Sequence, residues 1–343
     1  MITRSRFLQV LAGGAGAFAL AGCGAQKAAD AGDEGKKDAA AEPVAVRAAA
    51  LKGPTAMGLV KFMSEVDAGN LKDEDYSFQI LASADEVAPL ISKSEADIAA
   101  VPANLASVLY NKTSGAVRVI AVNTLGVLYI CELGDTVSTV ADLRGKTIFS
   151  AGKGATPEYA LEYVLRANGL DPAADVTIEW KSEHAECVAA LAQDATAIAM
   201  LPQPFVTTAQ AKNDQIRVAL DLNQEWAAAC EAEGRDGKLI TGVAVVRSEF
   251  ADAHPEAVDA FLGHYRESVE FVNANTDEAA ALVGGYDIVP EAVAEKALPA
   301  CNITFVDGAD MKAQLSGYLE VLADQNADAV GGKLPGDDFY YGA

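Results

Sequence analysis

The 343-residue chain is poor in the residue types that build metal centres, with five cysteines and three histidines. Apart from Cys23, the cysteines are far apart and form no Cys-x-x-Cys pair; they are Cys131, Cys187, Cys230 and Cys301. This spacing argues against a zinc or iron–sulfur centre, and we expect no metal and no cofactor. Four cysteines allow three disulfide pairings, but buried free thiols suit the apolar neighbours of Cys131 and Cys187 equally well. Both states stay open.

Basic residues are also scarce. The 26 Lys and Arg against 49 Asp and Glu give a formal charge of −23. Such an acidic body repels nucleic acid and anionic membrane surfaces, so we expect neither as a direct partner. Apolar residues make up 51% of the chain, which excludes global disorder. The length is sufficient for two domains of ordinary size.

Residues 1–22 have the features of a secretory signal peptide. Arg4 and Arg6 precede an apolar, small-residue run over 7–20, which ends in Leu20-Ala21-Gly22-Cys23. This tetrad resembles the lipobox of bacterial lipoproteins, which implies that Cys23 becomes the acylated first residue of the mature chain. In a plain secreted protein, the cysteine would be incidental. The start also resembles a twin-arginine signal, but Ser5 replaces the second arginine, so the export route stays open.

A low-complexity stretch follows the cysteine. Residues 24–43 consist mainly of Ala, Gly, Asp, Glu and Lys, with no aromatic residue. Such a composition buries too little apolar surface to fold by itself. We therefore expect residues 23–43 to be a lipidated cysteine and a flexible tether to the folded body.

From residue 44 onward, apolar strand-like runs alternate with amphipathic segments of helical period. The expected strands are 44–51, 76–82, 97–101, 117–122, 146–150, 176–180, 197–201, 216–220 and 242–246. The expected helices are 56–66, 85–93, 103–110, 157–168, 183–193 and 204–212, then 255–275, 276–283, 290–298 and 309–324 in the last third. The alternation predicts right-handed βαβ units with mainly parallel sheets, and a helical tail follows them.

Four stretches carry a resemblance to a known family. They are LKGPTAMG at 51–58, DIAAVPAN at 97–104, DLRGKTI at 142–148 and LPQPF at 201–205. The chain resembles the solute-binding proteins of ABC importers, and within them the nitrate/sulfonate/taurine and thiamine-precursor (NMT1-like) group. The likeness covers about residues 44–275, and the DLRGK element is its most specific part.

The resemblance implies an α/β, two-lobed fold of the periplasmic-binding-protein type (type II). Each lobe would be a mainly parallel sheet flanked by helices, with a helical C-terminal tail. Lobe 1 would comprise residues 44–125 plus 242–343, and lobe 2 residues 126–241, with crossings near 123–128 and 240–243. The ligand would lie in the cleft between the lobes, in agreement with the rule that open sheets bind ligands beyond the carboxyl ends of their strands.

Strand ends followed by helix N-termini supply the candidate ligand residues, because unpaired amides and the positive end of the helix dipole favour polar ligands. In lobe 1 and at the crossing, the candidates are Gly53, Thr55, Ser83, Pro102, Asn104 and Gly126. In lobe 2, they are Gly154, Ala155, Thr156, Ser182, His184 and Gln203. The alternatives are that Thr55 only caps its helix, that 154–156 form an ordinary turn, and that His184 is a solvated cap residue. The 152–157 loop lacks the Gly-Lys-Ser/Thr ending of a phosphate loop, so nucleotide hydrolysis is not expected.

The resemblance implies ligand capture without catalysis. An open form would bind a small solute, the lobes would close by hinge rotation, and an ABC permease with its ATPase would import the solute. The protein would be lipid-anchored through Cys23 on the outer face of the cell membrane, or on its periplasmic side. The alternatives are a sensor that presents its ligand to a membrane receptor, and an enzyme on the same fold, such as a menaquinone-pathway or pyrimidine-synthase-like enzyme.

The solute class is less well defined. The candidate loops offer only Lys52, Lys153 and Lys181, whereas a sulfonate or nitrate site would gain from an arginine fork. This favours an uncharged or aromatic heterocycle, such as a vitamin precursor. A sulfonate or nitrate held by helix N-termini stays open.

Overall fold

The computed structural model describes residues 43–343 except 84–85, 195 and 236, and residues Pro43–Ala343 form one compact unit. The predicted signal peptide, Cys23 and almost all of the predicted tether lie outside the described residues. The described part is an α/β structure with one six-stranded and one five-stranded sheet, which confirms the predicted fold class. The division of the chain into lobes stays a prediction.

The first sheet has the strand order β11-β4-β10-β3-β1-β2. Its strands are β1 (Ala45–Leu51), β2 (Asp75–Leu81), β3 (Ile98–Pro102), β4 (Val117–Leu125), β10 (Ile240–Arg247) and β11 (Ile303–Val306). Strands β1 to β4 run in one direction, and β10 and β11 run against them. The connecting helices are α1 (Pro54–Met57), α2 (Val60–Asp67), α3 (Val87–Ser92) and α4 (Ala103–Thr113).

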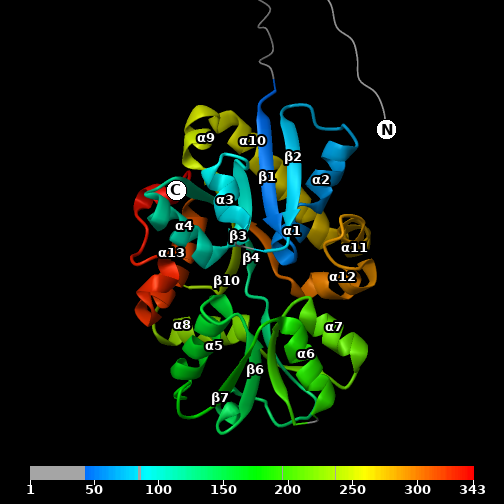
Figure 1. Cartoon of the computed structure of the whole chain (residues 1–343), viewed down its shortest axis with the longest axis vertical. Helices are drawn as coiled ribbons and strands as arrows, with labels where there is room; N and C mark the ends of the chain where they lie inside the picture. Colours follow the sequence, from blue (N-terminus) through cyan, green and yellow to red (C-terminus); the bar gives the residue numbers. More distant parts are fainter. Residues whose placement is uncertain (1–42, 84–85, 195, 236) are drawn as a thin grey trace, which may run out of the picture. The chain divides into compact units, whose positions relative to one another are not determined.

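The second sheet has the order β7-β6-β8-β5-β9. Its strands are β5 (Leu128–Glu132), β6 (Thr147–Ala151), β7 (Thr177–Lys181), β8 (Ile198–Pro202) and β9 (Arg217–Asp221). Only β5 runs against the other four. Its helices are α5 (Thr156–Ala167), α6 (His184–Gln193), α7 (Phe205–Lys212) and α8 (Leu222–Ala232). Figure 1 shows α5 and α8 on one side of this sheet and α6 and α7 on the other.

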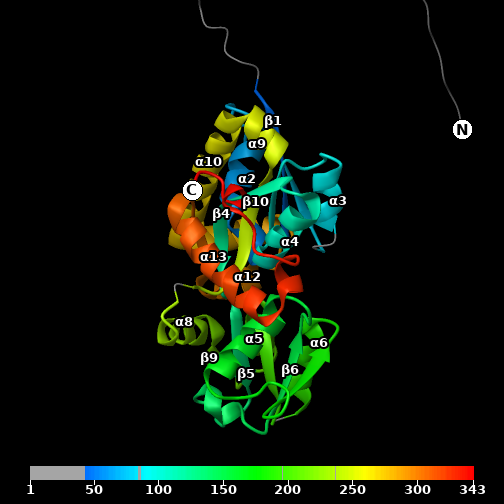
Figure 2. The same ribbon diagram turned by 90° about the vertical axis from the view of Figure 1, so that its left-hand side faces the viewer.

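The last third of the chain is mainly helical, as predicted. It contains α9 (Ser248–Ala253), α10 (Pro255–Ala274), α11 (Thr276–Gly285), α12 (Glu291–Ala297) and α13 (Gly308–Gln325), with 3₁₀ turns at Leu298–Ala300, Ala327–Val330 and Asp337–Phe339. Helices α2, α10 and α11 share one hydrophobic core over the first sheet. Helix α13 lies beside β4 (Figure 2) and shares a second core with α4, α5 and α8, which extends over both sheets.

The predicted helix 56–66 is divided in two, with Gly58 and Leu59 between α1 and α2. A Cβ atom on Gly58 would lie 3.1 Å from Ile303 and 3.2 Å from Val269, so the chain passes close to β11 and α10 at this point. Strands β5 and β11 and helices α8 and α9 had not been predicted. All five residues of β5 are buried, so the strand lacks the alternation that would reveal it.

Each sheet has a buried carboxylate at the edge where its parallel strands begin, here called the amino edge. In the first sheet, Asp97 is fully buried and binds two arginines: Arg47 at 2.8 Å and Arg247 at 3.0 Å. Burial acts to raise the pKa of Asp97, but the hydrogen bonds from both arginines outweigh it and hold the pKa below its ordinary value.

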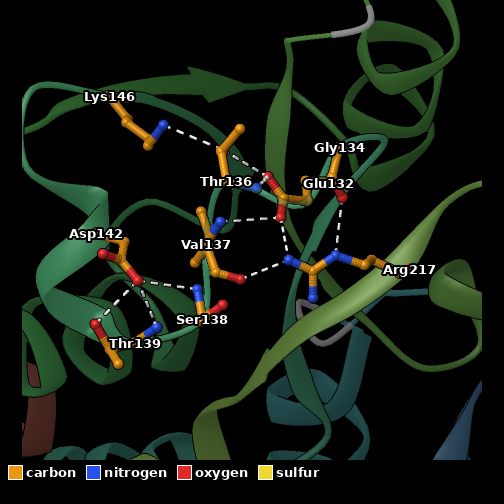
Figure 3. Close-up of polar contacts among 9 residues, drawn as sticks. All are labelled: Glu132, Gly134, Thr136, Val137, Ser138, Thr139, Asp142, Lys146 and Arg217. Atoms are coloured by element: carbon orange, nitrogen blue, oxygen red, sulfur yellow. Dashed lines mark hydrogen bonds and ion pairs between the residues drawn. The ribbon is translucent and has the colours of Figure 1, made fainter.

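In the second sheet, Glu132 has the corresponding position (Figure 3). Its carboxylate accepts hydrogen bonds from Thr136 Oγ1 at 2.8 Å and from the Val137 amide at 3.0 Å, and it pairs with Arg217. Arg217 also donates to the carbonyls of Gly134 at 2.8 Å and Val137 at 2.6 Å. These contacts fix the end of β5 to the beginning of β9, so both sheets are fastened at their amino edges.

Candidate functional site

The two sheets meet through the ends of their parallel strands, here called the carboxyl edges. Thr156, which follows β6, lies 3.5 Å from Asn104 Oδ1, which follows β3. Asn302 donates to the carbonyl of Gly126 at 2.5 Å, and Tyr129 donates to the carbonyl of Ala300 at 2.8 Å. We call this region, where residues from both carboxyl edges come into contact, the inter-sheet junction.

Thr156 also makes a buried polar contact at the junction. Its hydroxyl lies 2.9 Å from the hydroxyl of Tyr318 on α13, and both side chains are buried. Tyr318 in turn packs against Trp226 on α8, with the ring centroids 5.6 Å apart. The residue that caps α5 is Ala155, not Thr156, which is the first helical residue. The Thr156 hydroxyl therefore does not cap α5 and is free to reach the first-sheet side.

The loop after β1 contains Gly53 and Thr55. Gly53 is the N-cap of α1, with a φ of 124° that favours glycine. The alternative reading of Thr55 as the cap is therefore wrong: its hydroxyl donates to the Leu51 carbonyl at 2.9 Å. Pro102, at the end of β3, is the N-cap residue of α4 and positions Asn104 in the first turn of that helix.

A buried polar group lies at the end of β4, where sequence reasoning had placed only a crossing. Asn123 is 1% exposed, and its Oδ1 accepts from Thr124 at 3.0 Å. The Asn123 side chain also lies beside the buried Tyr265 hydroxyl, and Thr241 Oγ1 on β10 has no hydrogen-bond partner among the described residues. Gly242 has no room for a side chain here, because a Cβ would lie 2.5 Å from Asn123 Oδ1. The sequence signal was a polar Asn-Thr pair that ends an apolar strand.

Gly126 follows β4 and connects the two sheets. A Cβ there would lie 2.8 Å from Leu239 and 2.9 Å from Asn223. Close packing therefore requires a glycine at this connection.

His184 and Ser182 follow β7. The His184 ring packs against Phe205 with centroids 5.2 Å apart, and its Nδ1 is buried without a hydrogen-bond partner in the described structure. Burial lowers the pKa of His184 to about 4, so the imidazole is neutral at pH 7. Gln203, after β8, is 6% exposed and accepts from Thr207 Oγ1 at 2.9 Å.

Gln203 also lines a cavity of about 320 Å³ between the second sheet and the segment around α12. Tyr129, Thr207 and Lys296 contribute to the same cavity.

Several backbone amides at the carboxyl edges donate hydrogen bonds to side-chain carboxylates of the same chain. The Gly154 amide donates to Glu158 at 2.6 Å, and the Ser182 amide donates to Glu186 at 3.1 Å. The remaining two pairs are Ser83 with Glu86 at 2.9 Å and Asn223 with Asp221 at 2.9 Å. These amides belong to four loops, three of which contain predicted ligand residues.

The predicted residues are thus only partly brought together. Asn104 and Thr156 touch across the junction. Thr55 and Asn123 both lie against Gly242. For Ser83, Ser182, His184 and Gln203, membership of one shared ligand site stays a prediction.

The described cysteines are buried and free. Burial raises the pKa of Cys131 and of Cys301 to about 12, so neither thiol is ionised at neutral pH. Within the described ranges, no group of three or more His, Cys, Asp or Glu side chains has the arrangement of a metal site. Residues 43–343 also include no described helix with the length and hydrophobicity of a membrane span.

Two α/β sheets that meet at their carboxyl edges have the fold of periplasmic binding proteins, and solved structures share this fold. An ABC transporter protein from Parabacteroides distasonis is 20% identical, with a TM-score of 0.71 over 87% of this chain and 98% of its own. The periplasmic aliphatic sulphonate-binding protein SsuA from Escherichia coli is 16% identical, with a TM-score of 0.67 over 86% and 92%. The nitrate-binding protein NrtA from Synechocystis PCC 6803 is 15% identical, with a TM-score of 0.54 over 74% and 69%.

The sequence itself identifies the family. The family model described as NMT1/THI5 like matches residues 62–279, more than half of the chain. The protein therefore belongs to the NMT1/THI5-like family, which confirms the family suggested by the sequence motifs. None of the curated proteins compared with the sequence matches it.

Proposed function

We propose that the protein is the extracytoplasmic substrate-binding component of an ABC importer. It captures a small solute at the inter-sheet junction, closes around it and delivers it to a permease with its ATPase. The observation that carries this proposal is the contact between the two carboxyl edges, made by Thr156 with Asn104 and Tyr318. Ligands of open α/β sheets bind at this edge, and the structural neighbours named for transport or solute binding have the same fold.

Hinge closure is supported by the connections between the sheets. In the described chain, β4 leads into β5 through Gly126 and Val127, and α8 leads into β10 through residues 233–239. Two short connections permit rotation of one sheet with its helices against the other. The Thr156–Tyr318 contact would then belong to the closed form and break on opening.

Attachment to the membrane is proposed through a lipid on Cys23, with the protein on the outer face of the cell membrane. The support is the lipobox-like tetrad before this cysteine. The lipid would hold the binding protein near its permease without a membrane-spanning helix.

A binding role without catalysis is supported by the chemistry of the described side chains. The thiols of Cys131 and Cys301 are buried and un-ionised at neutral pH, which removes them as nucleophiles. The neutral groups at the junction, Asn104, Asn123 and Thr156, are suited to hydrogen bonding and not to nucleophilic attack.

The proposal is tested with the mature protein. Native mass spectrometry should show a copurified small solute, and adding that solute to stripped protein should raise its melting temperature. Small-angle scattering should show a smaller radius of gyration with the solute than without it. Asn104→Ala should weaken binding, whereas Asn275→Ala, which removes an exposed side-chain bond to the Phe271 carbonyl at the end of α10, should not. A protein that binds no solute from a broad metabolite library, with identical scattering throughout, would contradict the proposal.

A further inference from the structure

The charges around the inter-sheet junction point to the class of solute. At a helix N-terminus, unpaired amides normally provide a site for an anion. Here the chain's own carboxylates already occupy amides of this kind. Glu158 accepts from Gly154 before α5, and Glu186 accepts from Ser182 before α6.

The same arrangement recurs elsewhere on the carboxyl edges. Glu86 accepts from the Ser83 amide before α3, and the Asp221 carboxylate caps α8 through the Asn223 amide. An oxyanion that entered these loops would meet a negative charge where it needs a donor. Placing like charges together in this way weakens binding.

The loops that contain these carboxylates offer few basic side chains. Lys52 pairs with Asp287 at 3.1 Å, and Lys181 pairs with Glu179 at 3.2 Å. The carboxyl-edge loops at 52–55, 82–86, 102–104, 152–157, 182–183, 202–204 and 221–223 contain no arginine. Lys153 is exposed, and the amide of the next residue, Gly154, donates to Glu158.

The buried groups at the junction are polar and neutral. Asn123 is 1% exposed and its side chain lies beside the buried Tyr265 hydroxyl, and Thr241 Oγ1 has no partner in the described chain. These groups suit a ligand with neutral hydrogen-bonding atoms, such as carbonyl oxygens, ring nitrogens and N–H groups.

We infer that the solute carries no negative charge: it is a neutral or cationic organic molecule, and sulfonates and nitrate are excluded by Glu158, Glu186, Glu86 and Asp221. This inference rests on the proposed function and concerns the same site. It separates this protein from its structural neighbours whose names specify sulphonate or nitrate.

The test combines identification with direct titration. Native mass spectrometry of the purified mature protein should release a solute that is neutral or cationic at pH 7. Calorimetric titration of the stripped protein with ethanesulfonate and with nitrate should give binding at least about 100-fold weaker than that solute.

A charge-neutralising variant tests the cause. In Glu158→Gln/Glu186→Gln, ethanesulfonate binding should strengthen about tenfold, since two like charges are removed. Glu256→Gln is the matched control, because Glu256 lies in the first turn of α10, outside the carboxyl-edge loops; it should leave ethanesulfonate binding unchanged.

The outcomes are distinct. A sulfonate or nitrate that binds wild-type protein as tightly as the copurified solute overturns the inference and leaves the proposed function intact. Failure of every neutral, cationic and anionic compound to bind overturns the proposed function itself. The wild-type measurements decide the inference even when the double variant does not fold.

Discussion

Replacing Tyr318 by phenylalanine removes the hydroxyl that lies 2.9 Å from Thr156 Oγ1 and keeps the ring in its place against Trp226. The Thr156 hydroxyl is then left with Asn104 Oδ1 at 3.5 Å as its remaining neighbour across the junction. Leaving a buried hydroxyl without a good partner costs about 1–3 kcal/mol. If the bond belongs to the closed form, this cost falls on closure alone.

A cost of about 1.4 kcal/mol changes an equilibrium tenfold. We therefore expect Tyr318→Phe to weaken solute binding about tenfold, because the closed, binding-competent form becomes rarer. The measurements are calorimetric titration with the copurified solute and small-angle scattering of the free and bound protein. The variant should need more solute to reach the compact form.

A double-mutant cycle and a control isolate the bond. Thr156→Val in the Tyr318→Phe background removes the unpaired hydroxyl, so the two losses should be less than additive, with a coupling of about 1 kcal/mol. Tyr286→Phe removes a comparable bond, 2.7 Å from Asp67, that does not join the two sheets, and it should leave binding unchanged. Unchanged affinity and scattering in Tyr318→Phe, or an equal loss in Tyr286→Phe, would refute the assignment of this bond to the closed form.

Three further predictions concern stability and reactivity. Asp97→Asn should lower the free energy of unfolding in urea by about 3 kcal/mol, because it breaks a buried ion pair. In the wild type, the stability that Asp97 contributes should be lost as the pH falls below the ordinary carboxyl range, since its folded pKa is lowered. An Asp97→Asn variant as stable as the wild type at pH 7 would contradict the ion-pair argument. Gly126→Ala should destabilise the protein by about 1–3 kcal/mol through overpacking. Gly263→Ala, in open space on α10, should stabilise it slightly. Equal effects of the two substitutions in thermal melts would refute the packing argument. Cys131 and Cys301 should react with iodoacetamide at pH 8 only after the protein is unfolded. Labelling is measured by mass spectrometry, and rapid labelling of the native protein would show that these thiols are not buried.

The order of strands and helices could be predicted from the sequence because short apolar runs, bounded by turn residues, alternate with amphipathic segments. The β-branched and alanine-rich runs of β3 and β8 and the amphipathic face of α5 are examples. Strand β5 could not be found in this way, since it is buried throughout and follows the connection at Gly126 without a turn signal. The break at Gly58 depends on the approach of β11 and α10, which are distant in the sequence.

The candidate site was predictable at the level of loops and not of atoms. The Gly-rich and Thr-containing loops after β1 and β6 were identified, but Gly53 and Ala155, not the threonines, are the caps. Which amide a carboxylate accepts from depends on side-chain conformation, so the pairing of Glu158 with Gly154 was not visible in the sequence. Asn123 was passed over because its significance lies in its burial, a product of the folded chain.

The buried carboxylates Asp97 and Glu132 affect where this protein can accept substitutions during evolution. Both hold their sheets together from the end remote from the inter-sheet junction. Substitutions in the loops after β1, β3, β6 and β7 therefore leave these anchors untouched, and we expect such loops to accept new residues at little cost in folding. A scaffold of this kind can acquire a different cargo while its framework is inherited intact, as the shared fold at 15–20% identity illustrates.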